Sequence, residues 1–402
     1  MSANSCNLKQ RRLLMLNASW SEIPFIAAAR KMGFYVITTS TKPDYPGHKY
    51  ADEYVYGDYR DTSKMIEIIK QYDIDAISWG CSDTCALTAC YLGEKLGFKG
   101  HDTYLNAQII HLKDKFKEFA KEHNIKTPVS NNYSSVDEAL ASASKVKFPV
   151  IIKPVDLAGG QGIQVVKKLE EYIGAIKNAF DKSKIKRILV EPFIEGTLHS
   201  LNTFIVNQKV VSYCTANDYS YLNKLMTNSG ISPADNWKEA VKQLIPETEK
   251  VARILGLVDG QLHMQYIMQP DGECYIIEMM RRNIGNNWSV MLNDSVGVNW
   301  AEWVIRAEAG MDCHNIPESK EPKGYYGYHM LMAPRNGKFL GVEVEKSIQD
   351  HIYHLTVKEQ PGFEISDYLN YKIGNAMVHF DTMEEKDYFM PRINELIKVV
   401  VE

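Results

Sequence analysis

The segment that decides the fold reads Phe148-Pro-Val-Ile-Ile-Lys153-Pro-Val-Asp-Leu-Ala-Gly159-Gly160-Gln-Gly162-Ile163. Its first half is a short apolar run that ends on Lys153, which is typical of a buried strand. The following proline and three glycines predict a loop whose backbone N–H groups can approach an anion closely. The lysine adds a point charge suited to phosphate. The spacing matches neither a P-loop nor a dinucleotide fingerprint, so we expect a phosphate flap of another kind.

Composition limits the classes of protein that this chain can belong to. A length of 402 residues predicts roughly two to four domains. A net charge of −4 without a long basic run argues against nucleic acid as a partner. The chain has no apolar run of about 18 residues, so we expect no membrane span, and its first residues do not resemble a signal peptide. Seven cysteines without tight pairing favour reduced thiols and a cytoplasmic protein.

Alternating strand and helix patterns run through residues 12–100 and predict a parallel, doubly wound sheet, which makes the fold class α/β. Further along, the patterns predict one charged helix over 106–125, a polar loop over 215–236 and a helix over 237–255. A hairpin is predicted from strands at 261–268 and 274–279, with a Pro-Asp-Gly turn between them. Short strands and glycine turns fill the tail from about 316, and a helix is predicted over 383–398.

Charged and polar residues are spaced around the flap in a way that suits one site. Lys115 lies on a helix before it, and Glu191 closes a strand after it. Gln265 and Glu278 fall on the two strands of the hairpin, where the alternation of side chains predicts that both face the same side. Arg282 follows Glu278 by four residues. Mg²⁺ prefers hard oxygen ligands such as those of Gln265 and Glu278. The planar guanidinium of arginine matches the geometry of carboxylates and phosphates.

Taken together, these motifs resemble the ATP-grasp superfamily. The resemblance rests on Asp114-Lys115, on the strand and flap from Phe148 to Gly162, on Val190-Glu-Pro-Phe-Ile-Glu-Gly196 and on Tyr275-Ile-Ile-Glu-Met-Met-Arg-Arg282. It implies an α/β, multi-domain fold with a Rossmann-like N-terminal domain, an ATP-grasp central domain with a lid, and a small β-rich C-terminal domain. The expected bounds are 1–105, 106–315 with a lid at about 126–195, and 316–402.

The resemblance also implies roles for individual residues. ATP phosphates would contact Lys115, Lys153 and the flap residues Gly159, Gly160, Gln161 and Gly162. Glu191 would accept from the adenine amino group, and the backbone of Pro192, Phe193 and Ile194 would bind the ring edge. Gln265 and Glu278 would hold Mg²⁺, or Mn²⁺ in its place. The residues expected to act in catalysis are Arg282, Lys153 and Glu278.

Two positions depart from the family pattern. Met280 stands where relatives commonly have an asparagine that binds the metal, and a thioether is too soft a ligand for Mg²⁺. Leu198 replaces an acid that often contacts the nucleotide. Asn283 or a water molecule could take the place of the missing asparagine.

The activity implied by the resemblance is an ATP-dependent carboxylate–amine ligase that works through an acyl phosphate. The offset between Glu278 and Arg282 resembles that of L-amino-acid ligases and of carbamoyl-phosphate-synthase-like proteins, which favours the joining of amino acids. The expected partners are a small carboxylate and an amine, with a homodimer as the assembly. Two alternatives stay open: a carboxyphosphate or formyl-phosphate enzyme of the purine-biosynthesis type, and an ATP-binding regulator without turnover.

Overall fold

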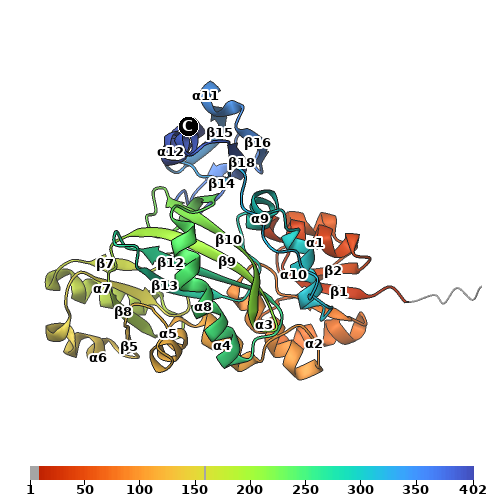
Figure 1. Ribbon diagram of the computed structural model, residues 1–402, viewed down its shortest axis with the longest axis horizontal. Helices are drawn as coiled ribbons and strands as arrows, with labels where there is room; N and C mark the ends of the chain where they lie inside the picture. The colour runs from red at the N-terminus through yellow and green to blue at the C-terminus, as the bar shows by residue number, and fades with distance from the viewer. Residues whose placement is uncertain (1–8, 158–159) are drawn as a thin grey trace, which may run out of the picture.

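The N-terminal part of the chain is a parallel sheet flanked by helices. The structure is a computed structural model that describes residues 9–157 and 160–402, and the elements below belong to those residues. The strands of the N-terminal sheet lie in the order β3-β2-β1-β4. They are β1 (Arg12–Leu16), β2 (Tyr35–Ser40), β3 (Glu53–Tyr56) and β4 (Ala76–Ser78). The helices are α1 (Ile23–Lys31), α2 (Thr62–Gln71) and α3 (Asp83–Leu96). This confirms the predicted Rossmann-like start, drawn in red to orange in Figure 1.

Two short helices lead from this sheet to a smaller antiparallel sheet, which we call the lid sheet. They are α4 (Tyr104–His111) and α5 (Lys113–Glu122). The lid sheet has the order β5-β8-β6-β7, with β5 (Asn131–Tyr133), β6 (Val150–Pro154), β7 (Gln164–Val166) and β8 (Ile188–Pro192). It carries α6 (Val136–Ala141) and α7 (Leu169–Lys182) on one side. Figure 1 shows it projecting from the central part of the molecule.

The largest sheet runs through the central and C-terminal parts in the order β13-β12-β9-β10-β11-β14-β18-β16. Its central strands are β9 (Thr197–Val206), β10 (Lys209–Ser220), β11 (Thr227–Ser232), β12 (Gly260–Met268) and β13 (Cys274–Met280). The helices of this part are α8 (Trp237–Leu255), α9 (Trp288–Val296) and α10 (Trp300–Glu308). Because β11 pairs with β14, the sheet continues across the expected domain boundary near residue 316.

The C-terminal part, blue in Figure 1, adds strands to the large sheet and packs a second small sheet beside it. The added strands are β14 (Tyr325–Leu331), β16 (Ile352–Val357) and β18 (Gly374–Phe380). The small sheet has the order β17-β15-β19, with β15 (Gly337–Val344), β17 (Glu364–Ile365) and β19 (Ile397–Val401). The remaining helices are α11 (Lys346–Gln349), α12 (Met383–Phe389) and α13 (Ile393–Leu396).

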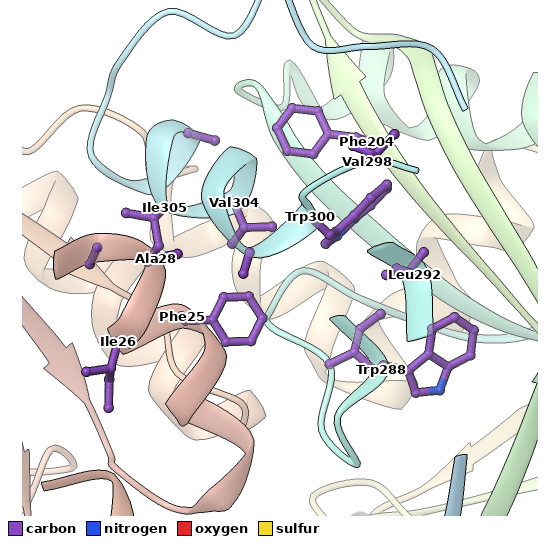
Figure 2. Packing of buried hydrophobic residues seen from close by; sticks show 14 of the residues in the cluster. Phe25, Ile26, Ala28, Phe204, Trp288, Leu292, Val298, Trp300, Val304 and Ile305 are labelled. Atoms are coloured by element: carbon purple, nitrogen blue, oxygen red, sulfur yellow. The ribbon is translucent and has the colours of Figure 1, made fainter. Parts of the chain in front are cut away.

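An apolar core joins the N-terminal domain to the large sheet. Phe25 of α1, Val304 of α10 and Trp288 of α9 belong to one buried cluster with Phe204 of β9 (Figure 2). Burying aromatic side chains of this size contributes much of the energy of such an interface. Trp300 also lies in this core, and its indole N–H donates to Gln261 Oε1 at 3.0 Å. Through this core, α1 of the N-terminal domain packs against α10, which in turn packs against β12 of the large sheet.

Three sequence-based expectations about individual elements are wrong. The helix expected over 106–125 is two helices, because Leu112 adopts an extended conformation with φ −96° and ψ 116°. The loop expected over 215–236 instead contains the end of β10 and all of β11, which pair with each other. The helix expected over 383–398 is split, and its last residues already belong to β19.

Residues 9–157 and 160–402 contain no helix that is both long enough and apolar enough to cross a membrane.

Candidate active site

The break between α4 and α5 places two lysines on one face of α5. Lys113 and Lys117 are four residues apart, so their side chains lie on the same side of the helix. Lys113 Nζ lies 3.6 Å from Glu278 Oε2 on β13. Lys117 Nζ lies 2.8 Å from Glu191 Oε1 on β8. The start of α5 thus connects the hairpin of the large sheet with the lid sheet.

Glu191 is held between two buried lysines. Lys153 on β6 pairs opposite Leu189, two residues from Glu191 on β8, so Lys153 and Glu191 share one face of the lid sheet. Lys153 Nζ donates to Glu191 Oε2 at 2.7 Å. The side chains of Lys117, Glu191 and Lys153 are 2%, 1% and 8% exposed. We call these three residues the lysine–glutamate triad.

Charge is unevenly balanced in the triad, which holds two cations and one anion. Burial lowers the pKa of Lys117 to about 8, although Glu191 opposes this shift. Burial acts against ionisation of Glu191, but Lys153 and Lys117 together hold the pKa of Glu191 below its ordinary value. The site therefore keeps a surplus of positive charge, which suits an anionic ligand such as a triphosphate.

Two side chains with hard oxygen atoms, Gln265 and Glu278, lie on the hairpin formed by β12 and β13. Gln265 of β12 lies directly opposite Glu278 of β13 in the antiparallel register, which confirms that the two side chains share a face. The Glu278 side chain is 29% exposed and has Lys113 as its ionic neighbour. Among the described residues, no cluster of three or more His, Cys, Asp or Glu side chains could hold a metal ion by itself. A metal here would therefore take further oxygens from phosphate or water.

A carboxyl group that the sequence did not single out lies next to Gln265. Asp218 Oδ2 accepts from Ser200 Oγ and, at 3.5 Å, from Gln265 Nε2. Burial raises the pKa of Asp218 to about 7. The residue was missed because the segment around it was taken for a loop, whereas it is the end of β10. No local signal marks it, because the pairing of Asp218 with Gly230 of β11 is what places it in a strand.

The raised pKa of Asp218 predicts a pH-dependent stability. Its carboxyl is protonated in the folded chain between about pH 4 and pH 7, whereas the unfolded chain is already ionised there. The contribution of the protonated Asp218 carboxyl to the stability of the fold is therefore present at low pH and is lost as the pH rises through about 7. We expect Asp218→Asn to stabilise the metal-free protein at about pH 8 by up to about 4 kcal/mol, with little effect at about pH 4.

Urea unfolding at both pH values measures this difference, and Asp350→Asn, at an exposed position, is the control. An equal effect of Asp218→Asn at the two pH values would contradict the assignment of a raised pKa.

The described ends of the flap contact α5 and the turn after β10. Lys113 Nζ donates to Leu157 O at 2.8 Å, which ties the start of the flap to α5. Gly160 has φ +75°, and a Cβ there would lie 2.6 Å from Leu225 O, so the position requires glycine. Gly162 has φ +70°, and its neighbour Gln161 is exposed. The predicted flap residue Gly159 lies outside the described residues.

The segment expected to bind the adenine edge begins at Pro192, the last residue of β8. Pro192 has no N–H, and the N–H of Phe193 donates to Pro149 O at 3.0 Å. Of the three predicted residues, Ile194 is therefore the one whose N–H is left to donate to a ring nitrogen. The carbonyl groups of all three are not affected by this bond.

Arg282 links the hairpin to the N-terminal domain. Its Nε donates to Asp83 Oδ1 at 2.6 Å, and Nη1 and Nη2 donate to Asn283 O and Met280 Sδ at 3.1 and 3.0 Å. Burial opposes its charge, yet Asp83 raises the pKa of Arg282. A guanidinium has five N–H groups, so two remain for a substrate oxygen. Arg281, in contrast, is fully buried and ion-paired with Asp102 at 2.7 Å.

Two expected residues lie away from the cluster. Lys115 points to another side of α5, where its Nζ donates to Gln108 Oε1 at 2.9 Å. Asn283 is fully buried and accepts from Gln261 Nε2 at 2.8 Å, so it does not replace the missing metal-binding asparagine. In this structure, Lys113 and Lys117 approach the acids instead of Lys115. They were missed because the break at Leu112 was not visible in the sequence.

Comparison with known proteins gives a family match over half of the chain. The model of the family described as "Carbamoyl-phosphate synthase L chain, ATP binding domain" matches residues 113–314. The large chain of carbamoyl phosphate synthase from Clostridium beijerinckii is 23% identical over 271 residues, which are 65% of this chain and 25% of that protein. The Helicobacter pylori large chain is 27% identical over 223 residues, 54% of this chain and 20% of that one. The chain spans about a quarter or less of the length of these relatives.

Solved structures resemble the chain over nearly its whole length. L-amino acid ligase from Bacillus licheniformis has a TM-score of 0.79 at 18% identity, and covers 98% of this chain and 99% of its own. Phosphoribosylglycinamide synthetase from Anaerococcus prevotii has a TM-score of 0.77 at 23% identity, with 98% and 100% covered. At these identities the likeness shows the fold, and the fold is that of ATP-grasp proteins.

Proposed function

The chain belongs to the carbamoyl-phosphate synthase L chain ATP-binding family, and from this premise we propose that it is an ATP-dependent carboxylate–amine ligase. The observation that supports this function best is that the lysine–glutamate triad, Lys113 and Glu278 lie together, and that Lys113 also bonds to Leu157 at the start of the glycine flap. Phosphoryl transfer requires little covalent work from the protein, so positioned cations and oxygen ligands are the groups such a site needs.

The nucleotide would lie between the lid sheet and the large sheet. Lys153 and Lys113 would contact its phosphates, with the flap from Gly160 to Gly162 closed over them. The N–H of Ile194 would donate to the adenine ring, and Glu191, which the two lysines keep ionised, would accept from the amino group. This division of roles follows the sequence-based proposal, except that Lys113 takes the phosphate role expected of Lys115 because of its position beside Glu278.

A divalent cation fits the donors on the hairpin. Glu278 and Gln265 present hard oxygens in register on one face, and Asp218 lies within hydrogen-bonding distance of Gln265. Such donors match Mg²⁺, whereas the thioether of Met280 does not. When bound, the cation would supply charge stabilisation to the phosphoryl oxygens. Mn²⁺ in its place is part of the proposal.

The reaction proposed here has two steps. A carboxylate oxygen of the first substrate attacks the γ-phosphorus of ATP, the bond to the β-phosphate oxygen breaks, and an acyl phosphate and ADP form. An amine then attacks the acyl carbon, the C–O bond to phosphate breaks, and the amine loses a proton. Lys113 and Lys153 would offset charge on the transferring group, and the two free N–H groups of Arg282 would hold an oxygen of the acyl phosphate. The closed flap would keep water from the acyl phosphate.

The proposed substrates are an amino acid and a second amino acid or small acid. The four-residue offset of Arg282 from Glu278 motivates this subclass. The test is a measurement of ADP and phosphate release across a panel of amino acids and carboxylic acids, singly and in pairs. ADP release that requires both an acid and an amine would support the ligase. Stabilisation by Mg-ATP without turnover on any pair would instead favour a regulator.

A matched pair of variants on α5 tests which lysine serves the phosphates. We expect Lys113→Met to weaken the binding of Mg-ATP by at least about tenfold, because Lys113 lies beside Glu278 and the flap. We expect Lys115→Met to have a smaller effect, because its Nζ is bonded to Gln108. Isothermal titration with a non-hydrolysable ATP analogue measures both. The reverse order of effects would restore Lys115 as the phosphate ligand.

A further inference from the structure

Two lysines of the C-terminal part lie side by side at one end of a strand pair. Lys358 directly follows β16, and Lys372 comes shortly before β18. The backbone N–H of Lys358 donates to Ile373 O at 2.8 Å, so the two positions are neighbours across the pair. Neither residue belongs to the site described above.

The side chains of both lysines reach toward other parts of the molecule. Lys358 Nζ lies 5.5 Å from the ring centroid of Trp20, which comes just after β1 in the N-terminal domain. Lys372 Nζ donates to Asn286 Oδ1 at 2.7 Å. Asn286 stands four residues after Arg282, in the loop that leads from β13 to α9. The lysines therefore lie where all three parts of the chain meet, and one of them is joined to the loop of the proposed acyl-phosphate arginine.

Neither lysine has a counter-ion. Within residues 9–157 and 160–402, no carboxylate oxygen lies within 4.0 Å of either Nζ. The nearby acid Glu359 accepts from Tyr371 OH at 2.6 Å. Burial lowers the pKa of Lys372 to about 8. Burial together with repulsion from Lys372 lowers the pKa of Lys358 to about 8, although the charge of Glu359 opposes this shift. Two partly buried like charges without an ion-pair partner are unfavourable unless an anion joins them.

We propose that Lys358 and Lys372 form a subsite for the anionic group of a substrate, a carboxylate or a phosphate, with Trp20 as its wall. The inference rests on the proposed ligase function, because it assigns the subsite to a substrate of that reaction. Ammonium groups are compact point charges that can approach one oxyanion from two sides. Asn286 accepts a hydrogen bond from Lys372, and because Asn286 stands four residues after Arg282, the subsite adjoins the loop that follows Arg282.

Titration of the full chain with simple anions tests the subsite. Inorganic phosphate and malonate are the probes, each added by isothermal titration in the presence of saturating Mg-ADP, which fills the nucleotide site. We expect binding to the unaltered chain and a loss of at least about tenfold in affinity in Lys358→Met and in Lys372→Met. Tighter binding of phosphate would indicate a phosphate-bearing substrate, and tighter binding of malonate a carboxylate.

The matched control is Lys398→Met, which removes an exposed lysine of the same part of the chain and should leave the affinity unchanged. The two test variants should stay folded, because each removes a charge that lacks a counter-ion. The proposal is overturned if neither probe binds the unaltered chain. It is also overturned if the double variant Lys358→Met/Lys372→Met binds both probes as tightly as the unaltered chain does. The affinity of each variant for Mg-ADP is measured separately. If Mg-ADP binds but the anions do not, this subsite is what fails; if Mg-ADP does not bind either, the nucleotide site fails.

Discussion

Replacement of Glu278 by glutamine is expected to lower ATP-driven phosphoryl transfer by at least about a thousandfold, equivalent to about 4 kcal/mol. Glu278 is the carboxylate of the hairpin that faces Gln265 in register and lies beside Lys113. Glutamine keeps the shape of the side chain but removes the negative charge that a divalent cation requires. The fold should persist, because the side chain is 29% exposed and its ion pair with Lys113 is long, at 3.6 Å.

The measurement is ADP release in the presence of Mg²⁺ and the substrates identified by the panel, with circular dichroism to establish that the variant is folded. Glu273→Gln is the matched control, since Glu273 lies on the same hairpin, is 52% exposed and pairs with Lys126. It should retain nearly full activity. A folded Glu278→Gln protein with turnover within about tenfold of the unaltered chain would falsify the metal assignment.

The hairpin could be predicted from the sequence because its geometry is local. The Pro-Asp-Gly turn and two alternating strands fix the register next to the turn, from Met268 opposite Cys274 to Tyr266 opposite Ile276. A shift of register between Tyr266 and Gln265 then brings Glu278 opposite Gln265, and this shift could not be predicted from the sequence. Like the turn, the glycines of the flap could be recognised locally, since Gly160 adopts a backbone conformation that other residues rarely take.

The partners that hold the site together could not be predicted in this way. Arg282 pairs with Asp83 across 199 residues, and no local pattern connects the two. The role of Lys117 depends on the break at Leu112, which the uninterrupted helical spacing conceals. Asp218 lies in a polar segment typical of loops, and this segment is a strand because β10 pairs with β9 and β11. Tertiary contacts override local propensity at each of these positions.

Replacement of Glu191 by glutamine is expected to destabilise the protein by about 3–5 kcal/mol. The reason is that Glu191 is the counter-ion of both Lys117 and Lys153, at 2.8 and 2.7 Å. Removing its charge leaves two ammonium groups in a site where all three side chains are less than a tenth exposed. An uncompensated buried charge is far more costly than the loss of an exposed pair.

Urea unfolding at about pH 7 and about pH 9 measures this effect. Glu191 opposes the lowering of the Lys117 pKa, so in the variant the folded-state pKa of Lys117 should fall further below that of the unfolded chain. The folded state then binds fewer protons, and its stability rises with pH. The deficit relative to the unaltered chain should therefore shrink at the higher pH. Glu249→Gln is the control, because its partner Lys209 is 62% exposed, and it should cost less than about 1 kcal/mol.

A second variant separates the loss of charge balance from the loss of packing. Adding Lys117→Met to Glu191→Gln removes one of the two unpaired cations, so the double variant should be more stable than Glu191→Gln alone. Methionine fills most of the space of the lysine stem and carries no charge. A double variant that is less stable than Glu191→Gln would contradict this account. Lys117 would then contribute to stability through its contacts with the lid sheet and Thr127, and Glu191 would not act by balancing the charge of the triad.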